Sequence, residues 1–309
     1  MRFWERVLGA CLAAGVLSLA HAGLVRADEH FKPFVLASRG PGDFDAKVAA
    51  VKDALAEGGF ELLGEYVPYD RTFVDKAHVV VVTNDELKQV AAMSKYGGFA
   101  APWRVAITEV GDDIQVAYAN PEYIANAYRL KSDLKQVATA LQSTLGAQQS
   151  FGAEKGLTAP ELRNYHYAFG MEYFDNPYQL AKYDNYQQAV DAVEKNLALG
   201  TAGVTKVYRV DLPGEVTVFG VARKAPSEAD IYMDEALIME EVDHGELKGT
   251  AYLPYEIMVE GREVVALNMR FRMAVHYPDL KMVGAHSFMG IMNSPAAIQK
   301  ALTEVAGGD

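Results

Sequence analysis

The residues best suited to chemistry gather between positions 258 and 292. Six of the eleven methionines lie in this stretch, together with His276 and His286. Thioether sulfur and imidazole nitrogen are good ligands for Cu(I) and for haem iron. The candidate metal site is therefore His276, His286, Met282 and Met289, for copper or haem iron. The alternative is that the methionines fill a core or a packed loop, because no Met-x-Met repeat accompanies them.

A second candidate is a cationic face on the segment from Val264 to His276. The alternation of apolar residues there predicts a strand. Alternate side chains of a strand share one face, which would bring together Asn268, Arg270, Arg272 and His276. Because guanidinium groups bind carboxylate, sulfate or phosphate well, we expect these four residues to bind a small anionic ligand. The alternative is that they form ion pairs within the protein.

Enzyme chemistry finds less support in the sequence. It contains no Gly-x-Ser-x-Gly elbow, no phosphate-binding loop, no dinucleotide fingerprint and no His-Glu-x-x-His motif. An acid–base pair of His276 and Asp279 would require both side chains to converge in one cleft. The sequence therefore favours a protein that is not an enzyme.

Residues 1–27 have the pattern of a secretory signal. Two arginines precede an apolar run from Val7 to Ala20, and small residues at Ala22 and Ala27 offer two cleavage sites. The run is too short for a comfortable transmembrane helix. We expect a protein exported to the periplasm or secreted, with no membrane anchor after cleavage.

Composition narrows the class of partner. Cys11 is the single cysteine and lies in the signal, so the mature chain can form no disulfide. The chain carries 29 basic and 41 acidic residues, a formal net charge of −12. Because an acidic protein repels polyanions, nucleic acid is not an expected partner.

The elements that must position these residues repeat along the chain. An amphipathic helix followed by glycine and a strand occurs at Phe44–Leu55 and again at Tyr186–Leu197. Pro102–Ile107 corresponds in the same way to Pro254–Val259. We predict an α+β fold of two tandem domains, each ordered strand, helix, four strands, helix. The predicted divisions are a signal at 1–27, domains at 31–145 and 166–306, a linker at 146–165, and an acidic, solvated insertion at 228–246.

Both halves resemble the bacterial domain-of-unknown-function family numbered 302. The resemblance rests on Phe44–Leu55, Gly59-Phe60, Ala119-Asn120-Pro121 and the equivalent positions of the second half. It implies an α+β fold of the TATA-box-binding-protein-like type, a curved antiparallel sheet with helices on one face. It implies no site residues and no DNA binding, since function resides in sites rather than in folds.

The aromatic run from Tyr165 to Phe174 is a further candidate for contact, either between the domains or with an external partner.

Taken together, the sequence favours a non-enzymatic periplasmic binding or accessory protein for a small anionic ligand. The alternatives are a soft-metal protein that uses Met and His, and a docking module for another periplasmic protein.

Overall fold

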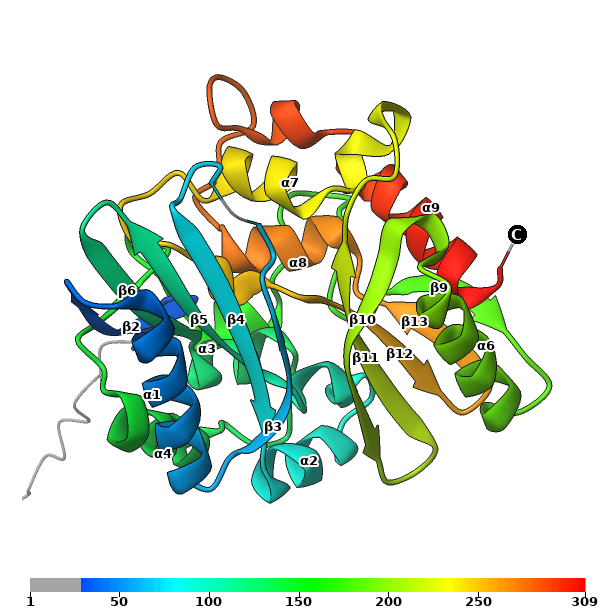
Figure 1. The fold of residues 1–309 in the computed structure, drawn as a ribbon. Coiled ribbons are helices and arrows are strands. Elements are labelled where there is room, and N and C mark those ends of the chain that lie inside the picture. Colours follow the sequence, from blue (N-terminus) through cyan, green and yellow to red (C-terminus); the bar gives the residue numbers. More distant parts are fainter. Residues whose placement is uncertain (1–28, 70, 309) are drawn as a thin grey trace, which may run out of the picture.

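The described part of the protein folds around two large antiparallel sheets with helices on their outer sides (Figure 1). This computed structural model describes residues 29–69 and 71–308, so the predicted signal lies outside the described residues. The mixture of antiparallel sheets and helices confirms the α+β class. None of the helices in the described ranges is long and apolar enough to cross a membrane.

The first sheet has the strand order β3-β4-β5-β6-β2-β7, and all neighbouring strands are antiparallel. Two helices, α1 (Phe44–Glu57) and α4 (Lys135–Leu145), pack together against one face of it. Phe44, Val51 and Leu55 form the buried side of α1, as their spacing predicts. The strands are β2 (Phe34–Gly40), β3 (Glu61–Tyr66), β4 (Lys76–Thr83), β5 (Trp103–Val110), β6 (Asp113–Ala119) and β7 (Gln149–Phe151), and the short helices are α2 (Asp85–Ala92), η1 (Gly97–Ala100), α3 (Pro121–Ala127) and α5 (Ala159–Arg163).

The second sheet has the order β10-β11-β12-β13-β9, again antiparallel throughout. Its outer helices are α6 (Tyr186–Ala198) and α9 (Ser294–Ala306), which pack on each other and on the sheet. The strands are β9 (Tyr178–Lys182), β10 (Val204–Leu212), β11 (Val216–Arg223), β12 (Tyr255–Glu260) and β13 (Glu263–Ala266), and the other helices are η2 (Thr201–Gly203), η3 (Glu228–Met233), α7 (Glu235–Val242), η4 (Thr250–Tyr252), α8 (Met269–His276) and η5 (Phe288–Ile291). A two-stranded sheet pairs β1 (His30–Phe31) with β8 (Leu157–Thr158).

The two halves share one topology. Strand β2 corresponds to β9, and the four strands β3 to β6 correspond to β10 to β13 in the same spatial order. Each fourth strand leads into a short helix, α3 or α8, before the last outer helix of its half. This correspondence agrees with the repeated patterns of the sequence; their origin by duplication stays a prediction.

Two of the contacts between the halves show how closely they meet. The edge strands β3 and β10 approach at Gly64, where an added Cβ would lie 2.4 Å from the carbonyl oxygen of Val207. Glycine is therefore needed at this approach. Helices α3 and α8 are joined directly, because the Tyr123 hydroxyl donates to the carbonyl of Val275 at 2.6 Å.

The predicted strand from Val264 to His276 is wrong in its second part. Strand β13 ends at Ala266, and Asn268 then caps helix α8. Apolar side chains in this segment fit a helical pattern as well as an alternating one, and short apolar runs leave that choice open. The cap decides it, because the Asn268 side chain accepts a hydrogen bond from the Arg270 amide.

Three other predicted segments also differ from the structure. Residues Tyr165–Met171 form turns instead of a strand, and β9 takes the strand position. The linker at 146–165 contains β7, β8 and α5 and adds a strand to the first sheet. The insertion at 228–246 is not a solvated face, since Met233, Ile238 and Met239 are buried in it. Apolar residues spaced among its carboxylates pack inward as helix α7.

Candidate functional site

Helix α8 presents two different faces. Residues four apart lie on one side of a helix, so Arg270 and Ala274 share one face and Arg272 and His276 share the opposite one. The predicted grouping of Asn268, Arg270, Arg272 and His276 on one sheet face does not occur. The helix divides these residues between a pocket and the protein interior.

The outward face of α8 lines an apolar pocket. The cavity has a volume of about 370 Å³. Met273 and Ala274 form its floor beside Arg270, and Met282 belongs to its wall. Small-molecule sites are typically concave, mostly apolar and supplied with a few polar groups. The full lining is Tyr167, Ala168, Met171, Arg270, Met273, Ala274, Tyr277, Leu280, Met282 and Phe288.

Arg270 is the charged side chain of this lining. Its Nη1 donates to Glu172 Oε1 at 2.9 Å, and its side chain is 43% exposed. The second oxygen of Glu172, Oε2, is buried without a hydrogen-bond partner among the described residues. Arg270 therefore retains donors that are not used by Glu172 and that an acidic group in the pocket could accept.

The inward face of α8 belongs to a buried ion cluster. Glu256 receives Arg104 Nη1 at 2.5 Å on one oxygen and lies 3.2 Å from Arg272 Nη2 on the other. All three side chains are at most 1% exposed. Although burial lowers it, the Glu256 carboxylate raises the pKa of Arg272 above its ordinary value. Arg272 Nη2 also donates to the carbonyls of Tyr252 and Pro254, each at 2.6 Å.

His276 lies beside the same cluster. Its Nδ1 is 2.8 Å from the carbonyl oxygen of Arg272, and its ring meets Tyr252 edge to face at 5.2 Å. Burial, together with the charges of Arg272 and Arg104, lowers the pKa of His276 well below its ordinary value. This neutral imidazole is fully buried and does not belong to the lining of the apolar pocket.

The predicted metal residues lie in different surroundings. His276 is buried, whereas His286 is exposed and stacks on His244 with ring centroids 4.6 Å apart. Met282 and Met289 are about half exposed, and the Met289 amide donates to the Met282 carbonyl. Between residues 29 and 308, omitting 70, no three His, Cys, Asp or Glu side chains are grouped to hold a metal. Metal binding through methionine stays a prediction.

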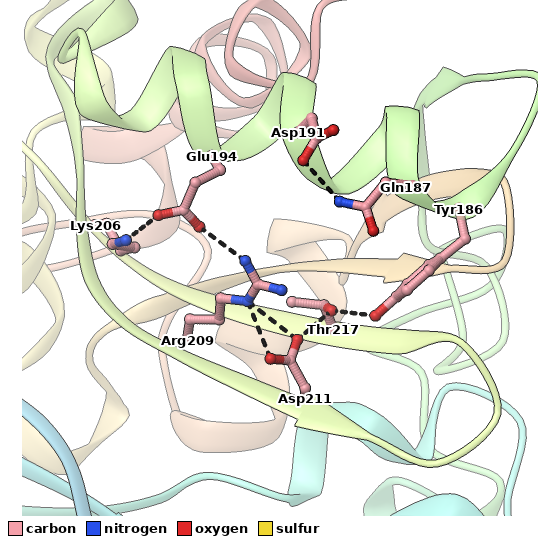
Figure 2. Close-up of polar contacts among 8 residues, drawn as sticks. All are labelled: Tyr186, Gln187, Asp191, Glu194, Lys206, Arg209, Asp211 and Thr217. Atoms are coloured by element: carbon pink, nitrogen blue, oxygen red, sulfur yellow. Dashed lines mark hydrogen bonds and ion pairs between the residues drawn. The ribbon is translucent and has the colours of Figure 1, made fainter.

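The polar contacts between α6 and strands β10 and β11 form a contrasting region (Figure 2). Arg209 donates to Asp211 at 3.0 Å, and Asp211 accepts from Thr217 at 2.6 Å. Thr217 in turn contacts the Tyr186 hydroxyl, while Glu194 accepts from Arg209. The groups drawn here satisfy one another and adjoin none of the cavities described. We infer that these contacts help to hold α6 against its sheet.

Part of the pocket was missed by reasoning from the sequence. Tyr167, Ala168 and Met171 come from the aromatic run that was expected to be a strand, and they instead fold over the outward face of α8. The aromatic composition was a usable signal for a contact surface. The sequence holds no signal for where this turn packs, because no residue pattern relates it to a helix about a hundred residues later.

Comparisons with known proteins find likeness only among solved structures. No family model and no curated protein sequence matches the chain. One similar solved structure is described as an uncharacterized conserved protein DUF302 from Bacillus stearothermophilus. It is 12% identical, covers 36% of this chain and 94% of its own, and has a TM-score of 0.33. A likeness of this size gives no basis for assigning a function.

Proposed function

We propose that this protein is a non-enzymatic binding protein for a small amphipathic anion, exported to the periplasm. The apolar part of the ligand lies in the pocket on α8, and its acidic group binds Arg270. The pocket itself is the observation that carries this proposal, since it combines an apolar lining with one guanidinium group. Because the chain as a whole is acidic, an anion is attracted to a local cation such as Arg270 and repelled by most of the remaining surface.

The size and lining of the cavity indicate the class of ligand. A volume of about 370 Å³ falls in the lower range of small-molecule sites. Methionine side chains at Met171, Met273 and Met282 adapt to ligands of different shape. A medium-length aliphatic carboxylate matches both the adaptable wall and the single cation. A highly polar anion such as sulfate would gain little from these walls.

Glu172 competes with a ligand carboxylate for the guanidinium group of Arg270. Its ion pair with Arg270 is partly exposed, and pairs of this kind contribute little to stability. A ligand carboxylate can therefore share or replace Glu172 at modest cost. A planar guanidinium with five donors can serve two carboxylates at once.

Calorimetric titration with octanoate tests the proposal. We expect octanoate to bind and octanol, its uncharged counterpart, to bind about tenfold more weakly. Arg270→Gln should weaken octanoate by about tenfold or more and leave octanol unchanged. Arg262→Gln is the matched control, because Arg262 is exposed in the turn after β12 and outside the pocket. Equal affinity for the two probes, or an unchanged Arg270→Gln, would contradict the proposal.

A docking module remains the second candidate because of one observation. The segment that starts at Met282 in the pocket wall exposes three further large apolar side chains, namely Val283, Met289 and Met292. Exposed apolar groups of this kind mark interaction sites. Native mass spectrometry of protein from its own periplasm separates the two roles. A small adduct lost in Arg270→Gln supports ligand binding; a polypeptide lost in Met289→Ser supports docking.

A further inference from the structure

A second cavity adjoins the apolar pocket and has a different character. The two cavities share Tyr277 and Leu280 as a common wall. The second has a volume of about 180 Å³ and lies between the halves of the molecule. Strands β2 and β7 provide one side, the segment after α7 a second, and the end of α8 a third. Its lining is Phe34, Phe151, Gly152, Val242, Asp243, His244, Gly245, Leu247, Gly249, Tyr277, Asp279 and Leu280.

Three aromatic rings form much of the wall. Phe34 lies 5.5 Å from Phe151 and 6.0 Å from Tyr277, measured between ring centroids, and both contacts are tilted. Two glycines make room for the central ring. A Cβ at Gly152 or at Gly249 would approach the Phe34 ring to 2.8 Å. The Phe34 ring is 0% exposed, so it supports the rings of Phe151 and Tyr277, which line the cavity beside it. Aromatic rings attract a cation through the negative charge density of their faces.

A carboxylate is buried in the same wall. Asp243 is 3% exposed, and its Oδ1 accepts a hydrogen bond from the Gly249 amide at 2.7 Å. Its Oδ2 has no hydrogen-bond partner in the described part of the chain. The nearby Lys248 ammonium is used elsewhere, donating to the carbonyls of Asp243 and Gly245 at 3.0 and 2.8 Å. A buried carboxylate oxygen of this kind calls for a donor or a cation.

We propose that this cavity binds an organic ammonium group, held between the rings of Phe151 and Tyr277 and the carboxylate of Asp243. Methylated or primary ammonium ions are attracted to aromatic faces and to a buried carboxylate together. A metal ion fits less well, because calcium and magnesium require about six oxygen ligands. Two carboxylates, Asp243 and Asp279, line this cavity.

The charges around the site predict how binding depends on pH. Burial raises the pKa of Asp243 to about 7, while the Gly249 amide and Lys248 oppose that rise. Tyr69 and Tyr277 also face this carboxyl, and burial raises the pKa of each well above its ordinary value, so both stay neutral. His244 and Asp279 complete the titratable lining. Because a cation favours the ionised carboxylate, its affinity should rise between about pH 6 and about pH 8.

Titration with choline, monitored by NMR of the protein and by calorimetry, tests the proposal. Its control probe is dimethylbutanol, in which carbon replaces the charged nitrogen at the same size. We expect choline to bind at millimolar concentration or below, and dimethylbutanol to bind about tenfold more weakly. Asp243→Asn should weaken choline about tenfold and remove most of the pH dependence. Phe151→Leu should weaken it about fivefold.

Two comparisons make the result decisive. Asp191→Asn, at an exposed position on α6, is the matched control and should leave choline binding unchanged. Asp243→Asn keeps a side-chain oxygen that can accept from the Gly249 amide, so we expect the variant to fold. Its melting temperature checks this. Folded Asp243→Asn that binds choline as the original protein does, or equal binding of choline and dimethylbutanol, would overturn the proposal. Octanoate affinity should not change in Asp243→Asn, which separates this site from the one at Arg270.

Discussion

Helices α3 and α8 occupy equivalent places in the two halves, yet they have opposite surroundings. Each follows the fourth strand of its sheet order, and each begins at a capping asparagine, Asn120 or Asn268. Helix α5 packs on α3. The outward face of α8 instead lines a cavity of about 370 Å³. The same fold thus tolerates both a covered helix and an open one, and so it does not itself require the pocket.

The outward residues explain this difference. Two and six positions after the cap, α3 has Glu122 and Asn126, and the side-chain amide of Asn126 donates to the Glu122 backbone carbonyl at 2.9 Å. At the same positions α8 has Arg270 and Ala274. The alanine leaves the space and the arginine supplies the charge. The pocket thus depends on two side chains of a helix whose counterpart in the other half is packed against α5.

The inward residues differ as well. Four positions after the cap, α3 buries Ile124 and α8 buries Arg272. A buried arginine needs a counter charge, which Glu256 supplies. Glu256 is the second residue of β12, and Arg104, its other partner, is the second residue of the equivalent strand β5. The two halves are therefore joined at matching positions by opposite charges.

The largest expected effect comes from removing that counter charge. Glu256→Gln leaves Arg104 and Arg272 buried without a carboxylate, and the free energy of unfolding should fall by about 3–5 kcal/mol. Urea denaturation measures it. Glu263→Gln is the matched control, because its pair with Lys182 is 44–54% exposed and should contribute less than about 1 kcal/mol. Similar losses in the two variants would show that the halves do not depend on the cluster.

The second effect is a pH dependence of stability, because the pKa values of carboxyls in the two halves are shifted in opposite directions. Burial raises the pKa of Glu235 and of Asp243 to about 7 each, against the opposing charges of Arg223 and Lys248. In the first half, Lys52 lowers the pKa of Glu65. A raised pKa means that the folded protein binds more protons, so these two carboxyls destabilise the fold as pH rises from about 4.5 to about 7.

Asp243→Asn should remove the share of this dependence that Asp243 causes. Its free energy of unfolding above about pH 7 should exceed that of the original protein by on the order of 3 kcal/mol, with little difference near about pH 4.5. Thermal unfolding across this range measures both. Glu235 is kept, because its removal would leave the buried Arg223 without a counter charge. Glu65→Gln should behave in the opposite sense and lose stability above about pH 5. An unchanged pH profile in Asp243→Asn would mean that this carboxyl ionises freely in the fold.

The sequence predicted the frame better than the site, for physical reasons that particular residues make clear. Helix α1 and strand β4 were predicted correctly because Phe44, Val51 and Leu55 repeat at helical spacing and a valine run fits a covered strand. Helix α8 was not, because its apolar residues satisfy both periods and the local Asn268 cap decides between them. Arg270, one of the four residues predicted to bind an anion, lines the pocket, but its separation from Arg272 depends on that cap; anion binding by Arg270 stays a prediction.

The second cavity lay beyond sequence reasoning for another reason. Its carboxylate, Asp243, belongs to an acidic segment of the kind that is usually solvated. It is buried because helix α7 carries Ile238, Met239 and Val242 into the core, and two of the three aromatic rings of the wall come from strands about a hundred or more residues earlier. Local sequence patterns do not indicate that these distant segments come together; that follows from the topology of the fold.

The smallest expected change is also the most direct test of the comparison between α3 and α8. Ala274→Leu adds apolar atoms to the pocket floor, where Ala274 is 5% exposed. Filling the cavity should raise the free energy of unfolding by up to about 1 kcal/mol and weaken octanoate binding by about tenfold or more. Asn126→Leu, at the matching position of α3, should leave octanoate binding unchanged. If Ala274→Leu instead destabilised the protein by more than about 1 kcal/mol, the space above α8 would be too small for a ligand, because added methylenes are costly where a core is already close-packed.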